Sequence, residues 1–98
     1  MTIAEWIDRR GRPVPAAFRP YLKAEGPVSL DALIGAAEAE LHACAGGASG
    51  DRAAAFSLLA ADAYFSYACI WALTEGDACD LRIIAERIVR AWTPGEPV

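Results

Sequence analysis

The 98-residue chain has a single histidine and three cysteines, the residues on which most metal and nucleophilic sites depend. Cys44, Cys69 and Cys79 form no CxxC pair. His42 lies two residues from Cys44 on a predicted helix, so the two side chains point to different faces. Cys69 lies near the far end of the next predicted helix, about 27 Å from its start by helical rise. These positions predict no metal site and no Cys–His or Ser–His–Asp catalysis.

The sequence also has no alternating strand pattern, no internal repeat and no glycine-rich phosphate loop. Gly46-Gly47-x-x-Gly50 follows no strand and contains no lysine. No N-terminal run combines a basic start, an apolar core and a small-residue cleavage site, so we expect no secretory signal. An odd number of unpaired cysteines favours free thiols in a reducing compartment. We therefore predict a cytoplasmic protein with no cofactor.

The longest segment without glycine or proline runs from Asp51 to Glu75 and carries one charge, Asp62, between Arg52 and Glu75. Its alanines and leucines favour a helix, which Asp51 is expected to cap and Gly76 to close in a left-handed conformation. A helix that is apolar nearly all round is either surrounded by other helices or lies in a membrane. Because a charge near its middle is costly in lipid, the sequence favours a bundle helix and predicts no membrane partner.

Two amphipathic helices flank this segment. The first is expected to run from Leu30 to about Cys44 and to end at Gly46-Gly47; the second is expected to be capped by Asp77, with Asp80 in capping-box position, and to stop at Thr93-Pro94-Gly95. Their apolar stripes recur at helical spacing and consist of Leu30, Leu33, Ile34, Ala37 and Leu41 in the first, and Leu81, Ile84, Ala85, Ile88 and Trp92 in the second. Short connections between helices predict antiparallel neighbours. Thr2 and Glu5 have the spacing of a capping box and predict a short N-terminal helix.

These elements predict an all-α fold, a small helical bundle around a central apolar helix. We expect a single helical domain over residues 1–98. Residues 1–27 form a short N-terminal helix and a basic, proline-rich arm, and residues 28–93 form the helical core, with three long antiparallel helices.

Charge is distributed unevenly along the chain. Five of the nine basic residues lie between positions 9 and 23 with no acid among them, whereas the rest of the chain has four basic and thirteen acidic residues. The simplest consequence is that the arm lies against the acidic body. Arg9, Arg10 and Arg12 are suited to phosphate contacts, and a nucleic-acid-associated protein using the 9–12 arm is one alternative hypothesis. The acidic body argues against nucleic acid as a partner.

Asp62 is the most informative single residue, because a carboxylate on an apolar helix needs either solvent or a partner. One interpretation makes Asp62 a solvated edge position or the partner of an arginine from the arm, of Arg82 or of Arg87. The other makes it a ligand contact or a general base, with Tyr64 and Tyr67 nearby.

The nine aromatic residues are more than a small core encloses easily, and aromatic residues favour interfaces. A second apolar face of the central helix also needs cover, and it consists of Leu58, Phe65, Cys69 and Ala72. Either the N-terminal helix and arm cover this face, or a second copy or another protein does.

We therefore hypothesise a non-enzymatic protein–protein interaction module of the homodimer, adaptor or inhibitor type, with homo-oligomerisation favoured. The predicted interaction residues are Leu58, Phe65, Cys69, Trp6, Phe18 and Tyr21. The second hypothesis is a small-ligand-binding or enzymatic domain with a pocket formed by Asp62, Tyr64 and Tyr67.

Overall fold

The computed structural model describes residues 1–10, 14–45 and 52–92, and within them the predicted all-α fold is confirmed. The elements in chain order are α1 (Ile3–Asp8), a 3₁₀ turn η1 (Arg19–Tyr21), α2 (Leu30–Ala45), α3 (Arg52–Thr74) and α4 (Ala78–Trp92). The described residues contain no strand beyond one isolated antiparallel bridge between Thr2 and Pro27.

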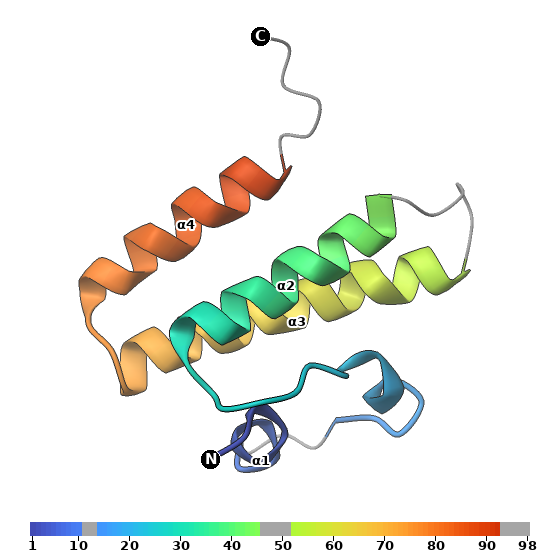
Figure 1. Ribbon diagram of the computed structural model, residues 1–98, viewed down its shortest axis with the longest axis horizontal. Coiled ribbons are helices and arrows are strands. Elements are labelled where there is room, and N and C mark those ends of the chain that lie inside the picture. The colour runs from blue at the N-terminus through green and yellow to red at the C-terminus, as the bar shows by residue number, and fades with distance from the viewer. Residues whose placement is uncertain (11–13, 46–51, 93–98) are drawn as a thin grey trace, which may run out of the picture.

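The α2–α3 pair forms the middle of the bundle. α1 and the arm lie on one side of this pair, and α4 lies on the other (Figure 1). α2 and α3 pack more closely than any other two elements, because α3 presents small side chains to the interface. Its buried residues are Ala60, Ala61, Tyr64, Ala68 and Ala72. Ile3, Trp6 and Ile7 from α1, Leu33, Ile34 and Ala37 from α2, and Ile84 from α4 complete the core.

The start of the chain folds back on the end of the arm. The predicted capping box is confirmed: Glu5 N–H donates to the Thr2 hydroxyl, and Thr2 N–H donates to the Glu5 carboxylate at 2.8 Å. Ile3 N–H donates to the carbonyl of Gly26 at 3.0 Å. Gly26 has a φ of 98°, which favours glycine because it lacks a Cβ. This turn brings the arm back to α1 before α2 begins.

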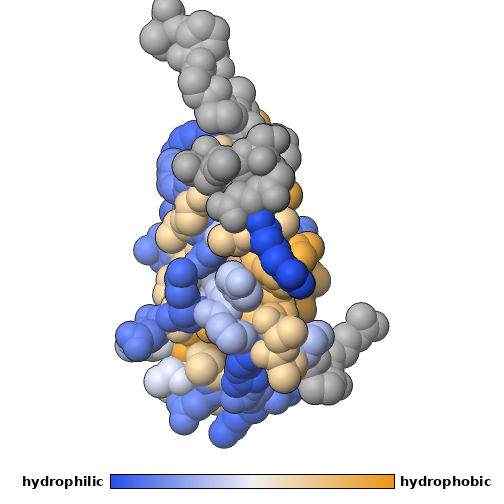
Figure 2. Space-filling view, turned by 90° about the vertical axis from the view of Figure 1, so that its right-hand side faces the viewer, coloured by the Kyte–Doolittle hydropathy of each residue, from blue (hydrophilic) through white to orange (hydrophobic). Residues whose placement is uncertain are grey.

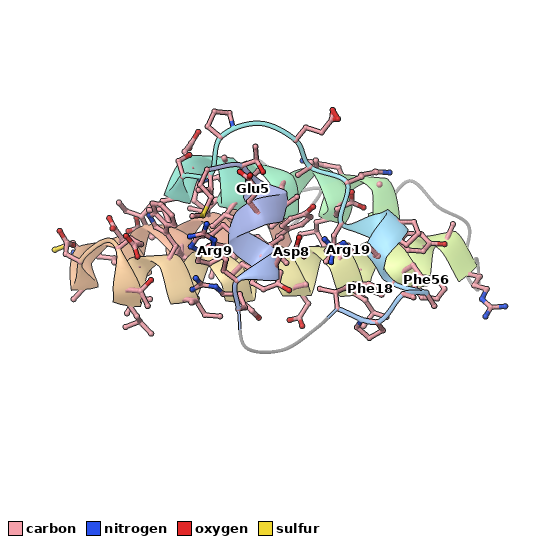
Figure 3. All side chains as sticks on the ribbon, turned by 90° about the horizontal axis from the view of Figure 1, so that it is seen from below. Glu5, Asp8, Arg9, Phe18, Arg19 and Phe56 are labelled. Atoms are coloured by element: carbon pink, nitrogen blue, oxygen red, sulfur yellow. The ribbon has the colours of Figure 1, made fainter. Side chains whose placement is uncertain are left out.

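Aromatic contacts fasten α1 and the arm to α3. Trp6 meets Tyr67 and Trp71 edge-on, with ring centroids 5.9 and 5.7 Å apart. Tyr21 stacks on Phe56 with centroids 4.5 Å apart. Figure 3 shows α1 crossing α3, with the η1 turn next to it over Phe56. The N-terminal segment therefore contacts one side of α3 at two places, at Phe56 and at Tyr67 and Trp71.

The junction of α3 and α4 departs from the sequence prediction. Gly76 was expected to end α3 in a left-handed conformation, and this is wrong, since Gly26 is the only glycine with positive φ in the described part of the chain. Instead, the amides of Glu75 and Gly76 both donate to the Trp71 carbonyl. A Cβ at position 76 would overlap the Asp80 carboxylate. Glycine at position 76 therefore leaves room for the Asp80 carboxylate and is not needed for its φ.

The predicted start of α4 is confirmed. The Asp77 carboxylate accepts from Cys79 N–H at 2.8 Å, and the Asp80 carboxylate accepts from Asp77 N–H at 3.2 Å. Other predicted boundaries lie outside the described residues, namely the Asp51 cap and the stops at Gly46-Gly47 and Thr93-Pro94-Gly95, and so does Arg12 of the arm.

Candidate functional site

One face of α3 is covered by no other part of the described chain. α2, the arm and α4 pack around the rest of the helix, and only 28% of an 18-residue window of α3 is buried within the chain. Leu59 and Leu73 are 54% and 71% exposed. We call this surface the open face, and it consists of Arg52, Ala55, Leu59, Asp62, Ser66, Cys69 and Leu73. Cys69 alone among them is half-buried.

By length and composition, α3 is the one helix in the described chain that could cross a membrane. Those two properties do not distinguish a span from a helix of a bundle. The residues that flank the open face are also apolar, and Phe56, Ala63, Phe65 and Ile70 are each half-buried. The result is a wide apolar surface with one charge near its middle, Asp62, and one at its N-terminal end, Arg52.

A groove adjoins the open face on the side of α4. It has a volume of about 360 Å³ and lies where α2, α3 and α4 meet. Its lining is Leu41 from α2, Leu58, Leu59, Ala61, Asp62 and Phe65 from α3, and Ile88 from α4. The groove is therefore apolar apart from the Asp62 carboxylate at its rim.

Hydrophobic residues gather on one side of the molecule, toward the right of Figure 2. Leu58 is 39% exposed, and Ile83 and Val89 of α4 are 43% and 65% exposed. Single exposed leucines are ordinary on a protein surface, whereas a contiguous apolar patch marks a site of interaction. Leu58 and Leu59, which share the groove with Phe65, form such a patch.

Asp62 is exposed and makes no ion pair or hydrogen bond with any residue that the structure describes. Of the arginines expected as its partner, Arg82 lies 3.5 Å from Glu86 on its own helix, and Arg87 is held by α2. No arginine of the arm that the structure describes pairs with Asp62. Asp62 is therefore exposed to solvent within the described chain and also lines the groove.

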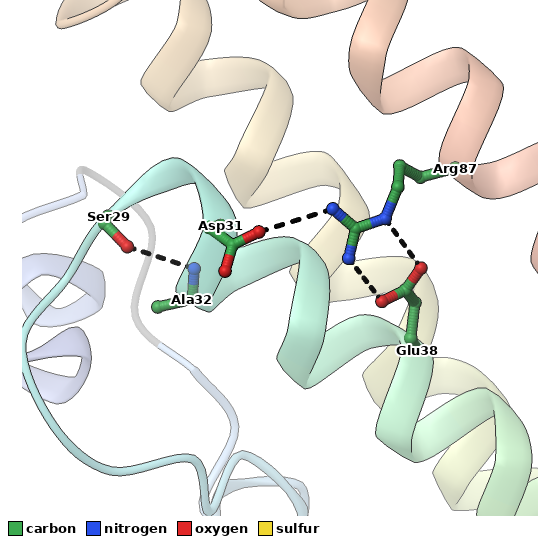
Figure 4. Close-up of polar contacts among 5 residues, drawn as sticks. All are labelled: Ser29, Asp31, Ala32, Glu38 and Arg87. Carbon is green, nitrogen blue, oxygen red and sulfur yellow. Dashed lines mark hydrogen bonds and ion pairs between the residues drawn. The ribbon is translucent and has the colours of Figure 1, made fainter.

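Arg87 instead ties α4 to α2 (Figure 4). Its Nε and Nη2 donate to the two carboxylate oxygens of Glu38 at 2.9 and 2.6 Å, and its Nη1 donates to Asp31 at 3.3 Å. The hydrogen bonds from Arg87 lower the pKa of the Glu38 carboxyl. The sequence analysis missed this cluster. Asp31 and Glu38 are seven residues apart and therefore share one side of α2, which is a signal that the sequence does contain.

The predicted interaction residues Trp6, Phe18 and Tyr21 make their contacts within the chain. Trp6 is 3% exposed, and the Arg10 guanidinium lies 4.2 Å from the centroid of its ring. Phe18 and Tyr21 are half-buried and stack with centroids 6.4 Å apart. Leu58 and Phe65, by contrast, line the groove beside α4, and Cys69 lies one turn beyond Phe65 on α3. The structure thus separates these six residues into an internal group and a surface group.

Tyr64 and Tyr67 do not join Asp62. Tyr64 is buried, and its hydroxyl accepts from the backbone N–H of Ala24 at 3.0 Å. Tyr67 lies against Trp6 on the side of the arm. Burial raises the pKa of both phenols. Asp62, Tyr64 and Tyr67 therefore do not form a common pocket. Of the three, only Asp62 lines the groove.

The basic arm is partly neutralised within the chain. Arg19 forms an ion pair with Asp8 at 2.5 Å, and the two side chains lie beside each other in Figure 3. Lys23 Nζ lies 4.0 Å from Glu40, which is 6% exposed and has one buried oxygen without a hydrogen bond in the structure. A charged residue beside the apolar stripe of a helix is ordinarily solvated, whereas Glu40 is buried because the arm lies over it.

The cysteines are free and separate. Cys44 and Cys69 are half-buried and Cys79 is exposed. Within residues 1–10, 14–45 and 52–92, no three histidine, cysteine or acidic side chains gather closely enough to hold a metal ion.

Comparisons of this chain with protein-family models, with curated protein sequences and with solved structures find no match. The open face and the groove together form the candidate site.

Proposed function

We propose that this chain is a non-enzymatic, cytoplasmic interaction module that binds another protein chain through the open face of α3 and the adjoining groove. The observation that carries the proposal is the exposure of Leu58 and Leu59 next to Phe65. Burying such a surface releases about 25 cal/mol for each Å² of apolar area. A partner could act as a second subunit, or this chain could act as an adaptor or inhibitor of that partner.

The contacts of Trp6 and Tyr21 also favour the open face and the groove as the binding surface. Their rings hold α1 and the arm against α3, so the apolar area that remains for a partner is concentrated on the opposite side of the helix. The arm supports a nucleic-acid function less well, because Arg10 stacks on Trp6 and Arg19 pairs with Asp8.

Site-specific photo-cross-linking tests the proposal. A photoreactive amino acid replaces Leu59 in the cells from which the protein comes, and a matched variant carries it at Glu86, which is exposed on the outer side of α4. We expect a discrete protein adduct from position 59 and none from position 86. The absence of an adduct at position 59, or equal adducts at both positions, would contradict the proposal.

The Asp62 carboxylate favours a second candidate function, the binding of a small apolar cation in the groove. A volume of about 360 Å³ falls within the range of small-molecule sites, which is roughly 300–1,000 Å³. Titration of isotope-labelled protein with 2-phenylethylamine, and with 2-phenylethanol as the neutral control, tests this candidate by NMR. We expect saturable shifts at Leu58 and Ile88 that are larger with the amine and that weaken in Asp62→Asn. Shifts that do not saturate would remove the candidate.

A further inference from the structure

We infer that residues 15–24 of the arm form a strap, a segment that opens from the α2–α3 pair as a unit while the rest of the fold stays intact. Its opening uncovers the Glu40 carboxylate and the Phe56 ring, so the strap regulates how much of α3 is available to a partner beside the open face. Only this regulatory consequence rests on the proposed function. The opening itself follows from how the strap is held and from what lies beneath it.

The strap is anchored at both ends but contributes nothing fully buried of its own. None of residues 15–24 is buried. By contrast, α1 on one side of the strap contributes Ile3, Trp6 and Ile7 to the core, and α2 on the other side also belongs to the core. Segments with few buried apolar contacts open at a lower free energy than the core does. The strap therefore opens without moving α1 or α2.

Few polar contacts hold the strap to the α2–α3 pair. The four backbone hydrogen bonds among its residues each span three or four positions, so they survive its opening. Arg19 pairs with Asp8 of α1 and not with the α2–α3 pair. Among the described residues, the one hydrogen bond from the strap to that pair is donated by the Ala24 N–H to the Tyr64 hydroxyl at 3.0 Å. The Ala24 amide therefore reports whether the strap is closed.

The closed strap covers a carboxylate that it leaves without a hydrogen bond. Glu40 of α2 is 6% exposed, and its Oε1 is buried with no hydrogen-bond partner. Lys23 Nζ lies 4.0 Å from the other oxygen, which is longer than a hydrogen bond, and the lysine side chain is 70% exposed. Burying a carboxylate without donors costs free energy, and hydration removes that cost when the strap opens. Glu40 thus favours the open state.

Opening also frees an aromatic ring next to the open face. Tyr21 of the strap stacks on Phe56 with ring centroids 4.5 Å apart (Figure 3). Phe56 lies three residues before Leu59 and is therefore its neighbour on the surface of α3. When Tyr21 leaves, the apolar surface around Leu59 extends onto the Phe56 ring. A partner that binds this larger surface favours the open strap, which couples binding to opening.

Native-state hydrogen exchange of the full chain tests the opening. Exchange is followed at increasing urea concentrations below the unfolding transition. We expect the Ala24 amide to open at a lower free energy than the amide of Ala68, a core residue of α3, and with a weaker dependence on urea, because local opening exposes little surface. Equal free energies and equal urea dependence at the two amides would mean that the arm opens only with the whole fold. That result, or an Ala24 amide with no protection at all, would overturn the inference.

A substitution tests the role of the covered carboxylate. Glu40→Met should slow exchange at Ala24 about tenfold or more, because an apolar side chain of similar length removes the unpaired carboxylate from the closed state. Glu86→Met is the matched control, since Glu86 is exposed on α4; it should leave exchange at Ala24 unchanged. Circular dichroism checks that both variants fold. Unchanged or faster exchange in Glu40→Met would exclude Glu40 as the residue that favours opening.

A loosened strap tests the regulation of binding. Tyr21→Ala removes the ring that covers Phe56. It should accelerate exchange at Ala24 and raise the yield of the adduct from a photoreactive residue at position 59 about fivefold. Faster exchange with an unchanged adduct yield would overturn the regulatory role. The absence of any adduct, with or without Tyr21→Ala, would contradict the proposed function instead, because the exchange measurements need no partner and test the strap by themselves.

Discussion

The guanidinium of Arg87 and the carboxylate of Glu38 form a bidentate ion pair, with N–O distances of 2.9 and 2.6 Å. They join α4 to α2, which contact each other far less than α2 and α3 do. Two parallel hydrogen bonds fix both distance and direction, so this pair sets the position of α4 over the α2–α3 pair. The groove has Ile88 as its wall on α4, and Ile88 is the next residue in the chain.

Removal of this guanidinium should loosen α4. Arg87→Ala is expected to lower the free energy of unfolding by about 1–2 kcal/mol, because two carboxylates of α2 lose a shared donor. Arg82→Ala is the matched control, since Arg82 is an arginine of the same helix whose side chain is 84% exposed; it should change stability by about 0.5 kcal/mol or less. Urea unfolding measures both values, and equal losses in the two variants would contradict a special role for Arg87.

Acid should weaken the same contact. The pKa of Glu38 in the folded protein lies below its ordinary value of 4.5, chiefly because of the hydrogen bonds from Arg87. The pair therefore contributes its full stability above pH 4.5, and that contribution is lost as the pH falls through the lowered pKa. Glu38→Gln should be less stable than the natural protein at neutral pH, and the difference should shrink in acid. Unfolding curves at several pH values provide the measurement, and a difference independent of pH would contradict it.

The hydroxyl of Tyr64 should hold the arm in place. Tyr64→Phe removes the acceptor for the Ala24 N–H and should lower stability by about 1–3 kcal/mol, because a partly buried donor loses its partner. Hydrogen exchange of the Ala24 amide should accelerate in this variant. Tyr67→Phe is the comparison, since the Tyr67 hydroxyl makes no hydrogen bond to the part of the arm that the structure describes; it should leave that exchange rate unchanged. Unaltered exchange in Tyr64→Phe would show that the arm is held by its aromatic contacts alone.

A side chain at position 76 should weaken the turn between α3 and α4. In Gly76→Ala, the new Cβ would displace the Asp80 carboxylate from its hydrogen bond with the Asp77 amide. The loss of this cap should cost about 1 kcal/mol. In an Asp80→Ala background the cap is already absent, so Gly76→Ala should cost clearly less. Thermal unfolding of the two single variants and the double variant measures the coupling, and strictly additive losses would argue against it.

Much of the fold follows from local features of the sequence. The capping box of Thr2 and Glu5, the cap at Asp77 and the stripe of Leu33, Ile34 and Ala37 each act within one or two turns of helix. Such features are read correctly because the atoms that interact are close in the chain. The error at Gly76 has the opposite cause. Whether Gly76 supplies a positive φ or only space depends on where the next helix begins. Here the Asp80 carboxylate caps that helix and occupies the space beside Gly76.

Two acidic residues show where sequence reasoning ends. Glu38 and Glu40 both flank the apolar stripe of α2 and look alike in the sequence, yet Arg87 holds the first from α4 and the arm buries the second. Their partners lie far away in the chain, and no spacing rule connects them. The same holds for Tyr64 and Asp62, which are two residues apart and end on different sides of α3.

The sequence by itself determined that a long apolar helix with one charge lies at the centre of an all-α bundle, because composition and helical periodicity are local properties of the chain. Only the tertiary structure decided which face of that helix is left open. α1 covers the side of Tyr67 and Trp71, and α4, which Arg87 joins to α2, covers a second side. Leu59, Asp62 and Leu73 remain exposed because no element that the structure describes packs over them.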